Sequence, residues 1–392
     1  MGTGQRSRVA ALGREDRARP VLHRAPLAGA RLEDPRAHPG DGARRERCVQ
    51  GTGGRLGGPA VSRAAVLLTG VGKRYDIVSC FARLTNTLAA DPSPLAPAQY
   101  AAQVRCEVPL IGDPGYVPAL ERLCEQHRVG AVLPLTDLDI VVLAEARAHG
   151  RLPAFVPSPA VARATYDKYE AHLLLGRLSL PSPPTALPED DDDGLSYPVM
   201  VKPRRGSGAR SIHLAHDAAQ ARFFADYIAE PVMLQQAMAG PELSIDCLGD
   251  LDGRCINAIP RTMLESRGGE SIKGAVVRDE ELIELGRSTM EALAVTGPAT
   301  IQVFRDPELG LRITDVNTRF GGAFPAPTYA ALPGRTYPEL IVAMASGETV
   351  EPHVGEFREG TTFTRYYWQL ELDERLSPTG RDVVPGGPPP PR

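Results

Sequence analysis

An alternation of short apolar runs with helical segments constrains the first half of this chain most strongly. The run "AAVLLTGVG" is apolar enough for a buried strand that ends in a turn, and "GAVLPL" is a second such strand. The stretches "YVPALERLCEQHRV" and "DIVVLAEARAH" carry apolar residues at helical spacing instead. Strands that alternate with helices predict a parallel α/β sheet, which we place over residues 62–160.

The pattern changes after Leu180, where "LPSPPTALPEDDDDGLSYP" is typical of an exposed connection. A strand "VMVKP", a Gly/Ser loop and a helix "DAAQARFFADYIAE" come next. The strands "PVMLQQ", "ELSIDCLGD" and "RCINAIP" then follow in hairpin-like succession. This order predicts a second, mixed α+β region that reaches residue 350.

Neither end of the chain shows a periodic apolar pattern. Residues 1–60 are rich in Arg, Gly and Pro, so they cannot bury enough apolar area to offset the entropy of ordering. We expect disorder there; a true start near Val61 and an arginine-rich targeting peptide are the alternatives. Residues 379–392, which end in "PGGPPPPR", are expected to form a flexible tail.

Charge and composition exclude several classes of protein. The 44 Lys and Arg residues nearly balance the 48 Asp and Glu residues, so nothing global favours nucleic acid or a membrane surface as the partner. No apolar run approaches the roughly 20 residues that cross a bilayer, and a secretory signal is missing. The six cysteines show no C-x-x-C pair, which argues against structural zinc and disulfides. We therefore expect a cytoplasmic protein.

Three short motifs fail on inspection. "GVGKRY" begins like G-x-G-x-x-G, but Tyr75 occupies the third glycine position. Read as a Walker A end, it has Leu67 in place of the first glycine and Arg74 in place of the Ser/Thr. His213 and His216 in "HLAH" lack a further ligand at metal spacing.

The stretch "YPVMVKPRRGSGARSI" predicts a phosphate-binding element. An apolar strand delivers Lys202, and a loop with Gly206 and Gly208 follows at once. Such glycines let backbone N–H groups close around phosphate oxygens while an ammonium group neutralises their charge. A surface lysine beside an ordinary turn is the alternative, since lysines at strand ends are common.

The stretch "ATIQVFRDPELGLRITDVNTRF" predicts a β-hairpin around "DPELG". Side chains two apart on a strand share a face, so Asp315, Asn317 and Arg319 would project together. The turn places Gln302 within a residue or two of Asp315. Oxygen ligands from Gln302, Asp315 and Asn317 would suit Mg²⁺, and Arg319 would bind an anion through its fork. A solvated outer face of the hairpin is the alternative.

Taken in order, these pieces resemble the ATP-grasp superfamily, and within it enzymes similar to the carbamoyl-phosphate synthase large subunit and pyrrolysine-pathway-type ligases. The resemblance covers residues 61–364 and is carried by "YDKYEAHLLLGRLSLPSPPT", "VMVKPRRGSGARSI", "PVMLQQAMAGPELSID", "PRTMLESRGGESIKG", and "IQVF" with "DVNTRFGG". It implies an α/β and α+β chain. An N-terminal parallel α/β pre-ATP-grasp domain (61–162) would precede a two-lobed ATP-grasp fold, with a small lobe at 163–236 and a large lobe at 237–378.

The resemblance implies a set of nucleotide-binding residues. Lys168 and Lys202 match the two lysines that contact ATP phosphates, and Gly206, Ser207 and Gly208 match the loop that closes over the β and γ groups.

The same resemblance places the adenine edge against the backbone of Gln235, Gln236 and Ala237. Glu242 matches the acid that binds the ribose hydroxyls.

The remaining residues carried over concern metal and catalysis. Gln302, Asp315 and Asn317 match the magnesium triad, for which Mn²⁺ is an alternative ion. Arg319 matches the arginine that faces an acyl-phosphate, and Arg261 matches a basic residue close to the phosphates or the substrate carboxylate. With Lys202, these two arginines are the expected catalytic residues.

Three positions depart from the family pattern. Asp315 stands where glutamate is usual, which shortens the reach by one methylene and bears on bridging of two metals. Thr318 stands where proline is usual, and Ser211 where the loop usually ends in another glycine. None of the three removes a charge, so we expect a working site.

The implied function is an ATP-dependent carboxylate–amine ligase whose partners are ATP, a small carboxylate and an amine. Whether the protein forms a homodimer is left undecided by the sequence. Phosphorylation of bicarbonate or carbamate is one alternative, although carbamoyl-phosphate synthase is a tandem of two such halves and this chain has one. A non-catalytic ATP-binding regulatory module is another. We expect the region around "LTGVG" and Asp91 to shape the substrate pocket, and specificity elements around Thr136, Asp137, residues 265–270 and the "GGAFPAP" loop.

Overall fold

The computed structural model describes residues 47–50, 63–190, 194–206, 208, 211–267, 270–322, 330–367 and 369–382. All of these lie in the unit Arg44–Arg392. No helix within these ranges is both long and apolar enough to span a membrane.

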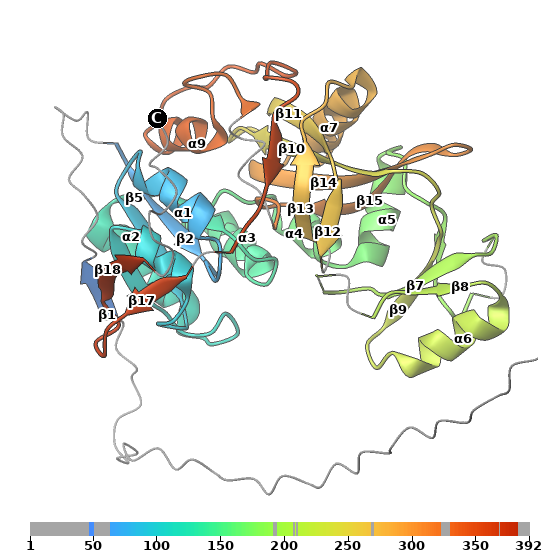
Figure 1. The fold of residues 1–392 in the computed structure, drawn as a ribbon, viewed down its shortest axis with the longest axis horizontal. Coiled ribbons are helices and arrows are strands. Elements are labelled where there is room, and N and C mark those ends of the chain that lie inside the picture. Colours follow the sequence, from blue (N-terminus) through green and yellow to red (C-terminus); the bar gives the residue numbers. More distant parts are fainter. Residues whose placement is uncertain are drawn as a thin grey trace, which may run out of the picture. The chain divides into compact units, whose positions relative to one another are not determined.

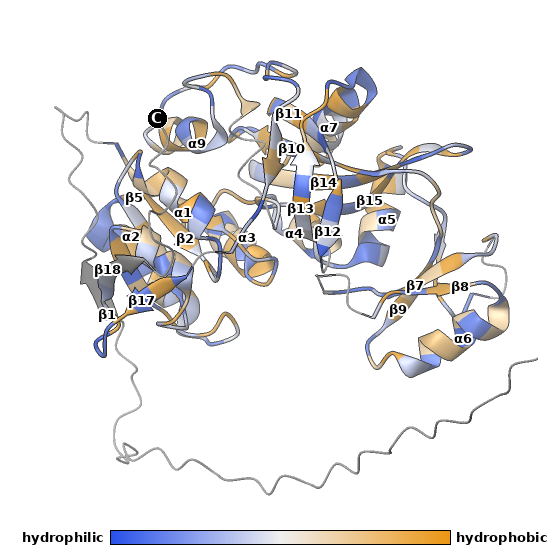
Figure 2. Ribbon diagram, viewed as in Figure 1, coloured by the Kyte–Doolittle hydropathy of each residue, from blue (hydrophilic) through white to orange (hydrophobic). Residues whose placement is uncertain are grey.

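The first sheet has five strands in the order β1-β4-β3-β2-β5 (Figure 1). Its strands are β1 (Arg47–Gln50), β2 (Ala65–Thr69), β3 (Thr87–Asp91), β4 (Val104–Glu107) and β5 (Val129–Pro134). Strands β2 to β5 run parallel, which confirms the predicted α/β sheet. Strands β2 and β3 are buried along their whole length, and β2 is apolar from Ala65 to Leu68 (Figure 2).

Helices cover both faces of this sheet. Its connections are α1 (Tyr75–Ala82), the 3-10 turn η1 (Pro97–Ala101), α2 (Tyr116–His127) and α3 (Ile140–Ala148). Helices α2 and α3 pack on one face, and α1 packs on the other together with α9 (Tyr337–Ala345). Because α9 comes from the far end of the chain, the first sheet shares a core with the C-terminal region.

Strand β1 corrects the expectation of disorder for residues 47–50, the part of residues 1–60 that the structure describes. It pairs antiparallel with the edge strand β4, from Arg47 opposite Glu107 to Gln50 opposite Val104. Backbone hydrogen bonds to an existing edge hold such a strand without an apolar pattern of its own, which is why the sequence does not reveal it.

Two helices lead from the first sheet to the second region. They are α4 (Pro159–Tyr166) and α5 (Lys168–Arg177). The Ser158 hydroxyl caps α4, and Asp167 caps α5 by accepting the backbone N–H groups of Tyr169 and Glu170. Asp167 thereby fixes Lys168 as the first residue of α5.

A small antiparallel sheet follows in the order β6-β9-β7-β8. It consists of β6 (Thr185–Ala186), β7 (Val199–Pro203), β8 (His213–Ala215) and β9 (Val232–Gln236), with α6 (Ala218–Tyr227) against it. The predicted succession of three hairpin strands is wrong at β9, which pairs with β6 and β7 rather than with the next strand in the chain.

The central sheet has the order β11-β10-β14-β15, all antiparallel. Its strands are β10 (Glu242–Gly249), β11 (Cys255–Thr262), β14 (Gly297–Asp306) and β15 (Gly310–Asn317), and α7 (Glu280–Ala292) covers one face. Ile245, Ile301 and Val316 pack against Leu282 of α7 in one buried cluster. The opposite face carries the polar residues of the candidate site.

A bulge at Thr314 sets the two faces of β15. Gln302 lies opposite Asp315, whereas its neighbour Val303 lies opposite Ile313, so Thr314 is an extra residue. Ile313 and Asp315 are two apart and would share a face on a regular strand. The bulge instead puts Ile313 into the apolar core and Asp315 on the polar face.

Short strands complete the described chain. They are β12 (Glu265–Arg267), β13 (Glu270–Ala275), β16 (Thr362–Thr364), β17 (Leu370–Leu372) and β18 (Pro378–Asp382). The β17–β18 hairpin corrects the expected start of the tail at residue 379, because its strand runs on to Asp382. Arg105 of β4 donates to the Leu376 carbonyl at 2.9 Å and so ties this hairpin to the first sheet.

Candidate functional site

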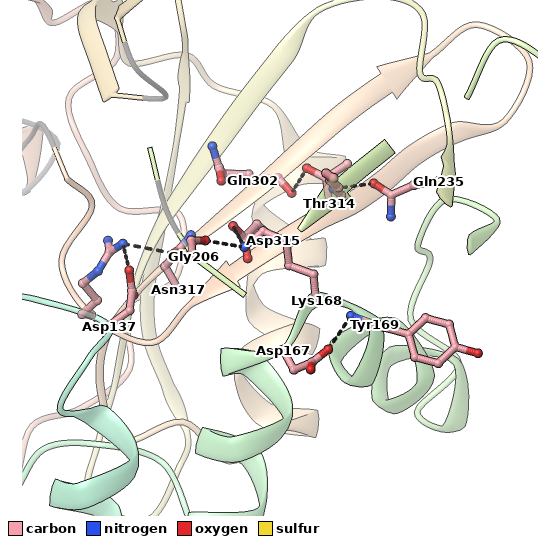
Figure 3. Close-up of polar contacts among 12 residues, drawn as sticks. Asp137, Asp167, Lys168, Tyr169, Gly206, Gln235, Gln302, Thr314, Asp315 and Asn317 are labelled. Atoms are coloured by element: carbon pink, nitrogen blue, oxygen red, sulfur yellow. Dashed lines mark hydrogen bonds and ion pairs between the residues drawn. The ribbon is translucent and has the colours of Figure 1, made fainter. Parts of the chain in front are cut away.

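The three residues expected to bind the metal lie together on the polar face of the central sheet. Gln302 on β14 lies directly opposite Asp315 on β15, and Asn317 lies opposite Thr300 two pairs further on. Figure 3 shows the Gln302, Asp315 and Asn317 side chains on these adjacent strands. The predicted hairpin and its register are therefore confirmed.

These three side chains offer the oxygen atoms that Mg²⁺ favours. The Gln302 amide nitrogen donates to Glu242 Oε1 at 3.0 Å, which directs the donor away and leaves the amide oxygen as an acceptor. No group of three His, Cys, Asp or Glu side chains suited to a metal occurs within the described ranges. One carboxylate and two amides fit a Mg²⁺ ion that takes its other ligands from water and phosphate.

Lys168 projects toward the metal ligands from the start of α5. Its ammonium lies 3.5 Å from Asp315 Oδ2 and donates to the Gly206 carbonyl at 3.0 Å. Its backbone N–H donates to the Arg204 carbonyl at 2.8 Å. Lys168 thus joins the metal residues to the glycine loop (Figure 3).

Asp167 connects the start of α5 to the two arginines that precede the glycine loop. The Arg204 Nε donates to both Asp167 oxygens at 3.0 and 3.1 Å, and the Arg205 Nε donates at 3.2 Å. The Asp167 carboxylate is buried and also caps α5. Asp167 lies in one of the stretches that resemble the family, but its sequence neighbours do not predict this role.

Lys202 is buried at the end of β7, where its ammonium donates to Gln235 Oε1 at 2.8 Å. Burial lowers the pKa of Lys202 to about 8, because the charged form loses hydration, and the neighbouring Lys168 lowers it further. The carboxylates of Asp315 and Glu242 oppose this shift. A phosphate group next to Lys202 would supply a negative charge that favours the protonated form of its side chain.

The glycine loop follows β7. Gly206 has a φ of 111° and Gly208 a φ of 80°, both in the region that favours glycine, which explains these residue types. Ser211, where the family usually has glycine, has a φ of 55°. Ser207 lies outside the described residues.

Two backbone N–H groups of the segment expected to bind adenine already have hydrogen-bond partners. The Gln236 N–H donates to the Pro184 carbonyl at 2.9 Å and the Ala237 N–H donates to the Pro198 carbonyl at 3.2 Å. These two backbone donors are therefore already used within the small sheet and its flanking segments.

Glu242 lies at the start of β10, beside the metal ligands. Burial raises the pKa of its carboxyl, and the nearby Arg261 charge and the bond from Gln302 oppose that shift. The bond to Gln302 joins the residue expected at the ribose to the magnesium triad. Sequence reasoning missed this link, although the pairing of β10 with β14 creates it.

Two arginines flank the metal residues. Arg261 on β11 is buried and donates from Nε to Asp246 Oδ2 at 2.7 Å. Arg319 follows β15 and donates from Nη2 to Asp137 at 2.7 Å and to the Asn317 amide oxygen at 3.1 Å. Asp246 was not foreseen from the sequence, whereas Asp137 was expected only as a specificity element.

A cavity of about 140 Å³ adjoins the metal residues. Thr136, Asp137 and Thr165 line it from the first region, and Lys168 and Asp315 line it on the other side. Residues 265–267 lie on the exposed strand β12 and do not line it, and most of the "GGAFPAP" loop is outside the described residues. Asp91 instead accepts the Gly72 and Ser93 N–H groups and shapes a turn.

Known families match both regions of the chain. Residues 66–151 match the family described as a PylC-like N-terminal domain, and residues 229–366 match the one described as an ATP-grasp in the biosynthetic pathway with Ter operon. The chain contains an ATP-grasp domain.

Solved structures share this fold. Biotin carboxylase from Campylobacter jejuni has a TM-score of 0.62 at 15% identity, covering 81% of this chain and 78% of that one. The biotin carboxylase domain of Hydrogenobacter thermophilus 2-oxoglutarate carboxylase, solved with MgADP and bicarbonate, has 0.61 at 16%, covering 77% and 74%. N5-carboxyaminoimidazole ribonucleotide synthetase from Thermus thermophilus has 0.60 at 17%, covering 76% and 81%. At such identities the likeness establishes the fold.

The fold brings several of the predicted residues into contact. Lys168, Gly206 and Asp315 meet directly, and Lys202 meets Gln235. Arg261 pairs with Asp246 inside the sheet, and its charge lies near Glu242.

Proposed function

We propose that this protein is an ATP-dependent ligase that phosphorylates a small carboxylate to an acyl-phosphate and couples it to an amine, releasing ADP and phosphate. The observation that carries the proposal is the contact of Lys168 with both Asp315 and the Gly206 carbonyl. This contact brings together the lysine proposed to bind phosphate, the strand proposed to bind the metal and the glycine loop. The ATP-grasp fold and the MgADP of a structural neighbour support the same reading.

The residues present would act by positioning and by charge. Gln302, Asp315 and Asn317 would hold Mg²⁺, and the bound ion would offset negative charge on the phosphate oxygens. Lys168 and Lys202 would hold the phosphates in line with the attacking carboxylate. Arg319 would stabilise and orient the acyl-phosphate through its bidentate fork. Mn²⁺ prefers similar oxygen ligands and would substitute.

Water must be kept from an acyl-phosphate, since it hydrolyses. We expect the loop with Gly206 and Gly208 to close over the phosphates, because glycine in this conformation leaves the backbone free to approach them. The cytoplasm, which supplies ATP and Mg²⁺, is the location that this proposal implies.

Bicarbonate is the alternative acid. The cavity of about 140 Å³ is close to the roughly 150 Å³ that holds a benzene-sized molecule, so it favours a small substrate. The 2-oxoglutarate carboxylase domain was solved with bicarbonate, which supports this second candidate. A non-catalytic ATP-binding module is the remaining alternative.

The test is Mg²⁺-dependent ADP release from ATP across pooled amino acids, small carboxylates and bicarbonate. Lys202→Ala and Asp315→Asn serve as inactive controls. Turnover that needs one acid and one amine, and disappears in both variants, would establish the ligase and identify its substrates. Tight ATP binding with no ADP above the variants in any pool would favour the regulatory module instead.

A further inference from the structure

Arg319 is held by a residue from the first sheet. Its side chain is 11% exposed, and its Nη2 donates to Asp137 Oδ2 at 2.7 Å. Its other acceptors are uncharged, namely the Asn317 amide oxygen at 3.1 Å and the Phe320 carbonyl at 3.0 Å. Asp137 therefore supplies the negative charge that offsets this guanidinium, in a site where solvent screens little.

Asp137 itself sits on a firmly anchored loop between β5 and α3. The Leu135 N–H donates to the Thr69 carbonyl at 2.9 Å at one end. At the other end Asp139 accepts the Thr69 hydroxyl at 2.6 Å and the Tyr116 hydroxyl at 2.9 Å. An anchor on both sides holds the Asp137 carboxylate in one place.

A second contact ties the same segment to the first sheet. Arg74, which precedes α1, donates from Nη1 to the Phe320 carbonyl at 3.5 Å. The Phe320 ring packs edge-on against Phe81 of α1, with ring centroids 6.2 Å apart. The residues directly after β15 are thus fixed from β5 and from α1 together.

We infer that Asp137 is a positioning residue that orients Arg319 toward the reacting phosphate, so that the first sheet completes the catalytic site. The inference rests on the proposed role of Arg319 in the ligase. A group that stabilises developing charge contributes most when it is held in place before the reaction. A long arginine side chain without its anchor would lose that orientation, and the chemical step would slow more than ATP binding.

The first experiment compares kinetics of Asp137→Asn and Asp137→Glu with the wild type and with Asp113→Asn, an exposed aspartate of the same sheet region. Asp137→Asn is expected to lower kcat by about tenfold or more and to leave KM for ATP within about twofold. Asp137→Glu restores the charge and is expected to recover part of kcat. Arg319→Met and the double variant with Asp137→Asn are expected to be equally slow. The inference would be overturned if Asp137→Asn had the same kcat as the wild type. It would also be overturned if the fold-loss of kcat in the double variant equalled the product of the losses in the two single variants.

The second experiment needs no substrate, so it separates this inference from the proposed function. Phenylglyoxal labels accessible arginines, and peptide mass spectrometry reports the labelling rate of Arg319. Asp137→Asn is expected to raise that rate about fivefold or more, while the exposed Arg163 reacts equally in both proteins. An unchanged Arg319 rate would show that Asp137 does not hold the guanidinium, even if the ligase activity is found.

Discussion

The ammonium of Lys168 lies 3.5 Å from the Asp315 carboxylate, and Asp315 lies directly opposite Gln302 across two paired strands. The proposed phosphate-binding cation and the proposed metal ligands therefore meet at one position. Lys168 is contributed by a helix and Asp315 by a strand 147 positions later, so the fold creates this relationship. The predictions below follow from these contacts.

Asp315 should set the metal requirement. Asp315→Asn removes the one carboxylate of the triad and is expected to lower ATP-dependent turnover by about 100-fold. Asp315→Glu adds a methylene and keeps the charge, so we expect it to retain activity and to change the Mg²⁺ concentration for half-maximal rate. Glu308→Gln in the turn of the same hairpin is the control. Full activity in Asp315→Asn would rule out Asp315 as a ligand.

Nucleotide affinity should fall in alkaline solution. Burial lowers the pKa of Lys202 to about 8, so its ammonium is charged below that pH and neutral above it. We expect the Kd of an ATP analogue to stay constant up to about pH 7.5 and to rise as pH passes 8. Lys202→Arg stays charged and should lack the rise. A constant Kd up to pH 9.5 in the wild type would contradict this account.

Asp167 should be important for stability. Asp167→Ala removes the cap of α5 and the carboxylate that pairs with Arg204, at an expected cost of about 3 kcal/mol in the free energy of unfolding. Arg205 is 67% exposed, so Arg205→Gln should cost less than about 0.5 kcal/mol. Urea unfolding measures both. Equal midpoints for the two variants would show that Asp167 is not the anchor.

Asp139 should make stability depend on pH. Burial raises the pKa of its carboxyl to about 6, although bonds from Thr69 and Tyr116 oppose the shift. A raised acid pKa stabilises the fold at low pH, and this contribution is lost as pH rises to about 6 and beyond. The unfolding free energy of the wild type relative to Asp139→Asn should fall by about 2 kcal/mol between pH 4 and pH 7.5. A difference that does not change with pH would contradict this prediction.

Local patterns predict much of the fold. Strands β2 and β5 are largely apolar, and the "DPELG" turn predicts the hairpin of β14 and β15 that brings Gln302 within a residue or two of Asp315. Strand β1 was missed because an edge strand held by backbone bonds needs no apolar pattern. The bulge at Thr314 was missed because it depends on which residues of β14 and β15 pack into the apolar core and which lie on the polar face of the sheet.

Long-range contacts account for what the sequence does not reveal at the site. Asp137 and Arg319 are 182 positions apart, and no local spacing predicts that they pair. The use of the Gln236 and Ala237 N–H groups by Pro184 and Pro198 likewise arises only when the small sheet forms. Residue types were readable from the sequence, but their partners were not.

The most direct test of the central claim is binding of a non-hydrolysable ATP analogue with and without Mg²⁺, measured by titration calorimetry. We predict that Mg²⁺ strengthens binding to the wild type by about tenfold or more and gives no such gain with Asp315→Asn, while Lys202→Met weakens binding in both conditions. An equal gain from Mg²⁺ in the wild type and Asp315→Asn would contradict the assignment of this polar sheet face as the metal–nucleotide site.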